Sequence, residues 1–419
     1  MFKFQPEEFI VEEITSGGEV LEVDRQITKL DEKLVSNNNF FSHFVLQKRL
    51  WTTGNAVRQI ADRLHINSGR INFAGNKDRN ALTTQLCSAF AIQPERLNSL
   101  NIKDIRILGA WLANEKVKLG GLSGNRFTLT LTEENIGKEE FGKLSEKKIL
   151  SKLKKNNYTL PNYFGDQRFG SARKNTAIVG KMLILGAFKE AVLNYLTCTD
   201  EGERDEVARA ARKRLSKEMD FGQALNYFPH FLRIEKQMLS HLVNNPNDFL
   251  GAFRRLHRPL QLLFIHAYQS YLFNLLLEKR VKGKKLLMPE IGGHYCKLDE
   301  FGFPEDEKAE FINSKQKVKD VSKLIKERTA VLLGQLIGYN SALSKGEEKL
   351  LAKEKIKKGE FVMKSTPELN SKGALRPNFV FLRDFSCEEF NEGGKRKIRL
   401  RFALPSGSYA TVALKEILS

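Results

Sequence analysis

Apolar and polar residues alternate along several stretches of this chain, which is the period of a half-buried β-strand. Helical spacing of apolar residues instead predicts an amphipathic helix over residues 55–64, capped by Thr53 or Asn55, and a final helix over residues 409–418. Strands are predicted near both ends of the chain, over residues 9–14, 40–50, 71–73, 85–92, 105–111, 116–119, 127–131, 379–381 and 398–404.

The middle of the chain has mainly helical periodicity. We predict a lysine-rich helical stretch over residues 138–155, a long apolar helix over 175–196 and a mainly apolar helix over 260–277. Polar residues four apart form a stripe on the last of these helices, at His266, Ser270 and Asn274. Residues 309–358 are expected to form helices and mobile loops. At 419 residues the chain is too long for one compact core, so two domains are expected.

A polar turn separates the strand that ends at Phe73 from the strand that follows. Gly75 and Asn76 both tolerate positive φ, which favours a turn, and the tip then presents Lys77, Asp78 and Arg79. A carboxylate between two cations should stay ionised near neutral pH. Pattern alone allows an ordinary solvated hairpin here. A phosphate-cradling loop is excluded, because no second glycine follows Gly75 at the required spacing.

Charge adds the next constraint. Sixty-nine Lys and Arg residues against fifty Asp and Glu residues give a formal net charge of +19. Such an excess attracts polyanions, of which nucleic acid is the usual one, although a generally basic proteome or salt adaptation is an alternative explanation. Charge provides affinity and steering without specifying a reaction.

Cysteine and histidine usage argues against a metal centre or a disulfide framework. The four cysteines are far apart with no C-x-x-C pair, and the seven histidines are equally scattered. We therefore expect no metal and no cofactor. No apolar run reaches the length of a bilayer span, and the N-terminus has no secretory apolar region, so we expect no membrane association and a cytoplasmic location.

Six segments, met in order from the first residues to the last, resemble the TruD family of tRNA pseudouridine synthases, and archaeal-like TruD proteins in particular. A motif set in the correct order over a whole chain is far more specific than one short loop. The segments are residues 3–13, 73–85, 120–127 (a glycine-rich turn followed by Asn-x-Phe), 160–170, 266–274 and 404–411.

The resemblance implies an α+β fold, the pseudouridine synthase fold. This fold has a mixed, largely antiparallel central sheet with flanking helices, is circularly permuted, and carries an inserted second α+β domain, the TRUD domain. Because the last motif rejoins the catalytic sheet, residues 1–162 plus 372–419 would form a discontinuous catalytic domain. Residues 163–371 would form the inserted domain.

The resemblance also implies a set of active-site residues. Asp78 would be the catalytic group, Lys3 would pair with it and keep it anionic, and Asn125 would position its carboxylate by a hydrogen bond. Phe127 would stack on the target base. The sequence alone favours a solvated charge for Lys3, whose role rests only on the resemblance, and a strand residue that faces the core for Phe127.

RNA contacts are predicted in two places. Lys77 and Arg79 flank the catalytic carboxylate. Residues 162–170, N-Y-F-G-x-Q-R-F-G, alternate aromatic residues with side chains able to contact bases and phosphates, which predicts RNA-binding roles for Asn162, Phe164, Gln167 and Arg168. A structural hinge, with glycines at the bends and aromatics packed below, is an equal alternative, and both can be true.

By resemblance the substrate is tRNA, and the target is uridine 13 in the D arm, which a monomer would flip out and isomerise to pseudouridine. Asp78 would serve either as nucleophile or as the base that removes the ribose C2′ proton. Two other classes remain open. One is a non-catalytic RNA-binding protein or RNA chaperone, and the other is a basic scaffold whose loop at Asp78 is structural.

Overall fold

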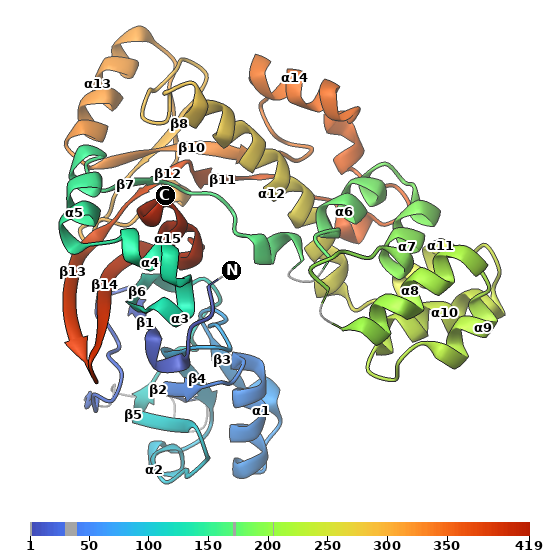
Figure 1. Cartoon of the computed structure of the whole chain (residues 1–419), viewed down its shortest axis with the longest axis horizontal. Helices are drawn as coiled ribbons and strands as arrows, with labels where there is room; N and C mark the ends of the chain where they lie inside the picture. The colour runs from blue at the N-terminus through green and yellow to red at the C-terminus, as the bar shows by residue number, and fades with distance from the viewer. Residues whose placement is uncertain (1, 30–39, 171–172, 204) are drawn as a thin grey trace. The chain divides into compact units, whose positions relative to one another are not determined.

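The computed structural model describes residues 2–29, 40–170, 173–203 and 205–419, which divide into two compact units (Figure 1). Unit 1 consists of Met1–Leu160, Leu298–Pro304 and Val380–Ser419. Unit 2 consists of Pro161–Lys297 and Glu305–Phe379, so its residues lie between those of unit 1 in the sequence.

Unit 1 is built on an eight-stranded sheet in the order β13-β14-β6-β1-β4-β2-β5, with β3 paired to β4. Among the described strands, β1 and β4 run parallel and the other neighbouring pairs are antiparallel, which confirms the predicted mixed, largely antiparallel sheet. The strands are β1 (Phe9–Thr15), β2 (Phe41–Arg49), β3 (Ile71–Phe73), β4 (Leu82–Phe90), β5 (Ile105–Ala113), β6 (Leu122–Leu131), β13 (Arg383–Glu392) and β14 (Lys395–Pro405).

The parallel pair fixes where two loops emerge. Ile10 on β1 lies beside Leu82 on β4, so the segments that precede these two parallel strands lie at the same end of the strand pair. One of these segments contains Lys3 and the other contains Asp78. The topology therefore brings the N-terminal segment and the predicted catalytic loop to the same end of the β1–β4 pair.

Helices cover the sheet face that bears the alternate residues Val11 of β1 and Phe127 of β6. Helix α1 buries Ile60 and Leu64 against β2 and β4, and α15 contributes Leu414 to a second cluster around Phe127. The unit 1 helices are α1 (Thr53–Leu64), α2 (Pro94–Asn98), α3 (Glu133–Ile136), α4 (Lys138–Lys143), α5 (Glu146–Lys155) and α15 (Ala410–Leu418).

Three expectations for unit 1 were wrong. The cap of α1 is Thr52, whose hydroxyl accepts a hydrogen bond from the N–H of Asn55. Residues 116–119 do not form a strand, because the N–H of Val117 donates to the Ser88 hydroxyl instead of to a strand neighbour. Strand β6 starts at Leu122 and not at residue 127 as expected. Gly124 lies within it, where a Cβ would come within 2.3 Å of the Leu404 carbonyl oxygen.

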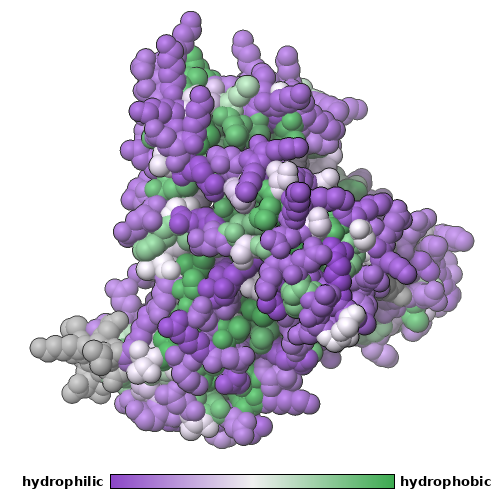
Figure 2. Space-filling view, turned by 60° about the vertical axis from the view of Figure 1, so that its left-hand side comes forward, coloured by the Kyte–Doolittle hydropathy of each residue, from purple (hydrophilic) through white to green (hydrophobic). Residues whose placement is uncertain are grey.

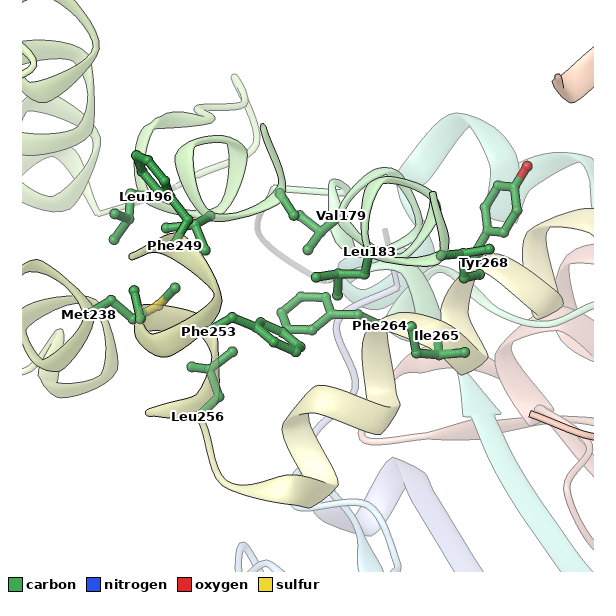
Figure 3. Packing of buried hydrophobic residues seen from close by; sticks show 14 of the residues in the cluster. Val179, Leu183, Leu196, Met238, Phe249, Phe253, Leu256, Phe264, Ile265 and Tyr268 are labelled. Atoms are coloured by element: carbon green, nitrogen blue, oxygen red, sulfur yellow. The ribbon is translucent and has the colours of Figure 1, made fainter. Parts of the chain in front are cut away.

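Unit 2 packs helices around a large apolar core, part of which is shown in Figure 3, and beside a four-stranded sheet of order β11-β10-β8-β9. The helices are α6 (Thr176–Ile184), α7 (Phe188–Thr197), α8 (Glu206–Glu218), α9 (Phe221–Tyr227), α10 (Arg233–Asn244), α11 (Phe249–Arg254), α12 (Arg258–Lys282), α13 (Lys315–Lys326) and α14 (Lys345–Glu354). The strands are β8 (His294–Lys297), β9 (Glu310–Phe311), β10 (Ala330–Leu336) and β11 (Ala374–Pro377).

Short elements complete the chain. Strands β7 (Thr159–Pro161) and β12 (Phe379–Phe381) pair with each other, and two of the four boundaries between the units fall within them. The 3-10 helices are η1 (Pro6–Glu8), η2 (Ser68–Arg70), η3 (Asp166–Phe169), η4 (Asp306–Lys308), η5 (Lys358–Phe361) and η6 (Pro367–Leu369).

Two expectations for unit 2 were also wrong. The long helix over residues 175–196 is two helices, α6 and α7, which are separated at Gly186, a residue with a φ of +73°. Residues 309–358 contain β10, which the sequence did not indicate. Its residues Val331, Leu332 and Leu333 are all buried, and a strand buried on both faces shows no alternation.

Hydrophilic side chains cover most of the face seen in Figure 2, and hydrophobic residues form patches between them. None of the helices formed by the described residues has both the length and the apolar character needed to cross a bilayer.

Candidate active site

Asp78 lies in the loop of residues 74–81 between β3 and β4, and buried polar contacts hold this loop on the sheet. The Thr53 hydroxyl, at the start of α1, accepts a hydrogen bond from the N–H of Lys77 (3.0 Å) and donates one to Gln85 Oε1 (2.9 Å). Gln85 Nε2 in turn donates to the Gly75 carbonyl (3.1 Å). The first half of the loop is therefore fixed by side chains of α1 and β4.

A buried lysine on β2 binds the same loop. Lys48 is 0% exposed, and its Nζ donates hydrogen bonds to the backbone carbonyls of Asp78 (2.8 Å) and Lys77 (3.4 Å). Burial lowers the pKa of Lys48 to about 8, although the Asp78 charge opposes this shift. The ammonium group is thus still mostly protonated near neutral pH.

Lys77 does not extend from the tip of the loop, as the sequence had suggested. Its Nζ lies 2.6 Å from Glu13 Oε2, and the two side chains are only 4% and 1% exposed. The other Glu13 oxygen accepts from the N–H of Leu86 (3.0 Å), which ties the pair to β4. A contact between Lys77 and RNA would require this ion pair to open.

The surroundings of the Asp78 carboxyl shift its pKa in opposite directions. Burial raises its pKa above the usual range, while the positive charges of Lys48 and Lys77 lower it. A carboxylate between two cations was expected, but the second cation is Lys48 and not Arg79, which is exposed. The structure thus gives a half-buried carboxylate beside two buried ammonium groups.

Asn125 lies on the same face of the sheet as this charge cluster. On β6 it is directly opposite Glu13 of β1, and Glu13 binds Lys77. Its Oδ1 is buried and has no hydrogen-bond partner among the described residues. An amide in this position can turn to offer Nδ2 as a donor. The positioning role predicted for Asn125 stays a prediction that this arrangement supports.

Phe127 lies in the core. Its ring is 4% exposed and stacks on Phe9, with the ring centres 6.3 Å apart and the planes at 14°. The ring of Phe402, a residue of β14, has its centre 5.8 Å from that of Phe127. Stacking on a target base would require the ring to leave these partners, so the core alternative describes Phe127 in this structure.

Lys3 is exposed, and its backbone N–H donates to the Asn135 carbonyl (3.2 Å). The cations whose charge acts on Asp78 are Lys48 and Lys77. Lys3 and Asp78 both precede strands that begin at the same end of the β1–β4 pair, and this is the only relation between them seen here. Its pairing with Asp78 stays a prediction.

In the motif of residues 162–170, two of the predicted RNA contacts are engaged inside unit 2. Asn162 is buried, where Nδ2 donates to the Pro377 carbonyl (3.0 Å) and Oδ1 accepts from Arg376 (2.9 Å). The same guanidinium group lies 4.0 Å from the centre of the Phe164 ring. These contacts support the structural alternative for Asn162 and Phe164.

The polar stripe on α12 explains the rest of this motif. The Asn274 side chain accepts from the N–H of Phe164 (2.9 Å) and donates to its carbonyl (3.0 Å). Arg168 Nε donates to the Ser270 hydroxyl (3.1 Å). Gln167 is exposed and, like Arg79, is available to solvent, so their contacts with RNA stay predictions.

A family model described as tRNA pseudouridine synthase D (TruD) matches residues 1–417. The chain belongs to the TruD family. A relative from Methanosarcina barkeri, named "Probable tRNA pseudouridine synthase D", is 35% identical over 98% of this chain and 91% of its own length. Another relative of that name, from Thermococcus sibiricus, is 34% identical over 99% of this chain and 94% of its own length.

The fold also matches that of a solved structure from this family. The crystal structure of the "tRNA pseudouridine synthase D (TruD) from Methanosarcina mazei" matches with a TM-score of 0.76 and 32% identity, over 100% of this chain and 93% of that one. The resemblance inferred from the motifs is therefore confirmed. Among the described residues, no group of three or more His, Cys, Asp or Glu side chains is arranged to hold a metal ion.

Sequence reasoning missed Lys48 and Glu13. Both carried a recognisable signal. Lys48 has the same parity along its strand as the buried Phe44 and Leu46, and Glu13 has that of Phe9 and Val11. A charged residue at a core-facing strand position needs a partner, which makes it a candidate for a functional or structural ion pair.

Proposed function

We propose that this chain isomerises uridine 13 in the D arm of tRNA to pseudouridine, with Asp78 as the catalytic group. The TruD family is one of tRNA pseudouridine synthases, and membership makes the chain an isomerase that acts on tRNA. The choice of uridine and the catalytic residue are the proposal. The observation that carries it is the half-buried Asp78 carboxyl held beside Lys48 and Lys77.

The reaction breaks the N-glycosidic bond of uridine, turns the base and rejoins it to the ribose through carbon. No atom is gained or lost. Asp78 acts either as nucleophile or as the base that removes the C2′ proton, and each role requires an ionised carboxylate. The charges of Lys48 and Lys77 favour that form and act against burial, which is the larger effect and leaves the pKa of Asp78 raised.

The carboxyl group needs fixed placement as well as charge. The backbone of Asp78 is held through its carbonyl by Lys48, and Lys77 is held through its N–H by Thr53. A carboxylate positioned in this way loses little freedom when the substrate binds, which is how enzymes reduce the entropic part of a barrier. The target uridine must leave its stack to reach Asp78, so we propose base flipping.

The position of the target can be tested with transcribed tRNA. Wild-type protein should form one pseudouridine at position 13, and a transcript in which uridine 13 is replaced by cytidine should yield none there. Pseudouridine at another position only would contradict the choice of uridine and leave the family activity intact. An RNA chaperone, the alternative suggested by the net charge of +19, would bind tRNA and form no pseudouridine.

A further inference from the structure

Unit 2 contains a basic groove of about 880 Å³ that the proposed chemistry does not use. Its lining comes from α9 and α10 and from the residues that follow α9 and α11. The cationic and imidazole side chains of this lining are His230, Arg233, Lys236, His241 and Arg255. We call this feature the α10 groove.

The two faces of α10 explain why the groove is polar. On one face Met238, Leu239 and Leu242 are buried in the core of unit 2, and Figure 3 shows Met238 in this core close to Phe249 and Phe253. The opposite face carries side chains three or four residues apart, which form one stripe along the helix. These groove residues are Arg233, Lys236, Gln237, Ser240 and Asn244.

The groove offers hydrogen-bond donors and positive charge, and its lining contains no carboxylate. Lys236 Nζ donates to the carbonyls of Leu225 (2.8 Å) and Phe228 (3.5 Å), so its charge is held in place without an acidic partner. Glu235 points to the other face of α10, where it accepts from Arg212 (2.7 Å). These carbonyl contacts leave the net charge of the groove positive.

One acidic residue stands next to the groove, and it is already bound. Asp248 accepts from the N–H of Gly251 (2.8 Å) and contacts His241 Nε2 at 2.8 Å. On its other side, His241 Nδ1 accepts from Arg255 Nε (3.2 Å). This chain of contacts fixes the Arg255 guanidinium group at the groove. Arg233, at the first turn of α10, is exposed.

We propose that the α10 groove binds phosphate groups of the tRNA backbone. Multiple donors, fixed positive charge and the lack of a lining carboxylate match a phosphodiester, which only accepts hydrogen bonds. The lining has no Phe, Tyr or Trp side chain, and its His241 ring is held between Asp248 and Arg255, so backbone contact suits it better than base recognition. This inference rests on the proposed function for the identity of the polyanion.

The test compares Arg233→Gln with Lys319→Gln in the full chain. Both changes remove one positive charge from an exposed helix face of unit 2, but Lys319 lies on α13 outside the groove. Arg233 is the first residue of α10, where loss of a positive charge suits the helix dipole, so the helix should persist. Equal circular dichroism and melting temperature of the two variants establish that both are folded.

Arg233→Gln should weaken tRNA binding about tenfold at physiological salt, as expected for one lost hydrogen bond between charged groups. The slope of log Kd against log salt should fall by about 1, and Lys319→Gln should leave both quantities near wild type. In turnover assays KM should rise with kcat unchanged, because Asp78 belongs to the other unit. Arg233→Lys should restore most of the affinity.

Equal affinities for Arg233→Gln and Lys319→Gln would overturn the groove assignment, whether both stay near wild type or both weaken. Failure of the proposed function has a different signature. If wild-type protein forms no pseudouridine but Arg233→Gln still weakens tRNA binding selectively, the groove stands and the enzymatic assignment falls. If wild-type protein forms pseudouridine and the Arg233 variant binds normally, only the groove falls.

Discussion

The buried ammonium group of Lys48 donates a 2.8 Å hydrogen bond to the backbone carbonyl of Asp78, and its charge acts on the carboxyl of the same residue. One side chain of β2 thus fixes the backbone of the candidate catalytic residue and favours its ionised form. This relationship places a lysine remote from the predicted motifs at the centre of the site.

Lys48→Met should therefore impair the reaction and change its pH dependence. Loss of the loop anchor should lower kcat/KM by about 100-fold, the scale of a small misplacement of a catalytic group. Because Lys48 lowers the pKa of Asp78, its removal should move the acidic limb of the pH–rate profile to higher pH. Lys103→Met, which removes an exposed lysine, is the control. An unchanged profile would remove Lys48 from the site.

Lys48 should also make stability depend on pH in an unusual direction. Its folded pKa is about 8, below the ordinary 10.5, so the unfolded chain binds the proton more tightly between these values. Relative to Lys48→Met, wild-type protein should gain about 3 kcal/mol of unfolding free energy as pH rises from 7 to above 10.5. Urea unfolding across this range measures the difference. A constant difference between the two proteins would contradict the buried charge.

Phe127→Ala should act on stability. The ring is enclosed by Phe9 and Phe402, so truncation should cost about 3–5 kcal/mol of unfolding free energy, whereas Phe127→Leu should cost much less. Urea unfolding of both variants checks this. If Phe127→Ala instead keeps wild-type stability and loses affinity for tRNA, the ring contacts the base and the family-based prediction for it is correct.

Asn162→Ala should also lower stability, here through a contact inside unit 2. It removes the side-chain oxygen that accepts from the buried Arg376, which should cost about 1–3 kcal/mol of stability. The tRNA affinity of the folded variant should equal that of wild type. Gln167→Ala, at an exposed position of the same motif, should leave stability unchanged. A variant of Asn162 with normal stability and weakened tRNA binding would favour the RNA-contact interpretation.

The sequence predicted the elements whose two faces differ in polarity. Alternation located β14 and helical spacing located α1, because each has one face in a core and one toward solvent over most of its length. Strand β13 was missed for a physical reason. It is an edge strand of mainly polar residues, none of which is fully buried, so the apolar alternation along it is weak.

The candidate site was predictable where local sequence determines local structure. The turn at Gly75 and Asn76 placed Asp78 between two strands, as found. Apart from Gln85 of β4, the partners of that loop come from β1, β2 and α1, at separations of more than twenty residues, and no local pattern encodes such pairing. Family resemblance supplied Asn125, whose positioning role stays a prediction, and it could not reveal that the ring of Phe127 lies among other phenylalanines.

The most direct test of the central claim compares Asp78→Asn with Asp62→Asn in a single assay of tRNA modification. Both changes remove one carboxylate charge from unit 1, and Asp62 is exposed on α1. After incubation with tRNA, chemical mapping should find pseudouridine with wild type and Asp62→Asn and none with Asp78→Asn, while all three proteins bind tRNA with similar Kd. Pseudouridine formation by Asp78→Asn at the wild-type rate would contradict the account.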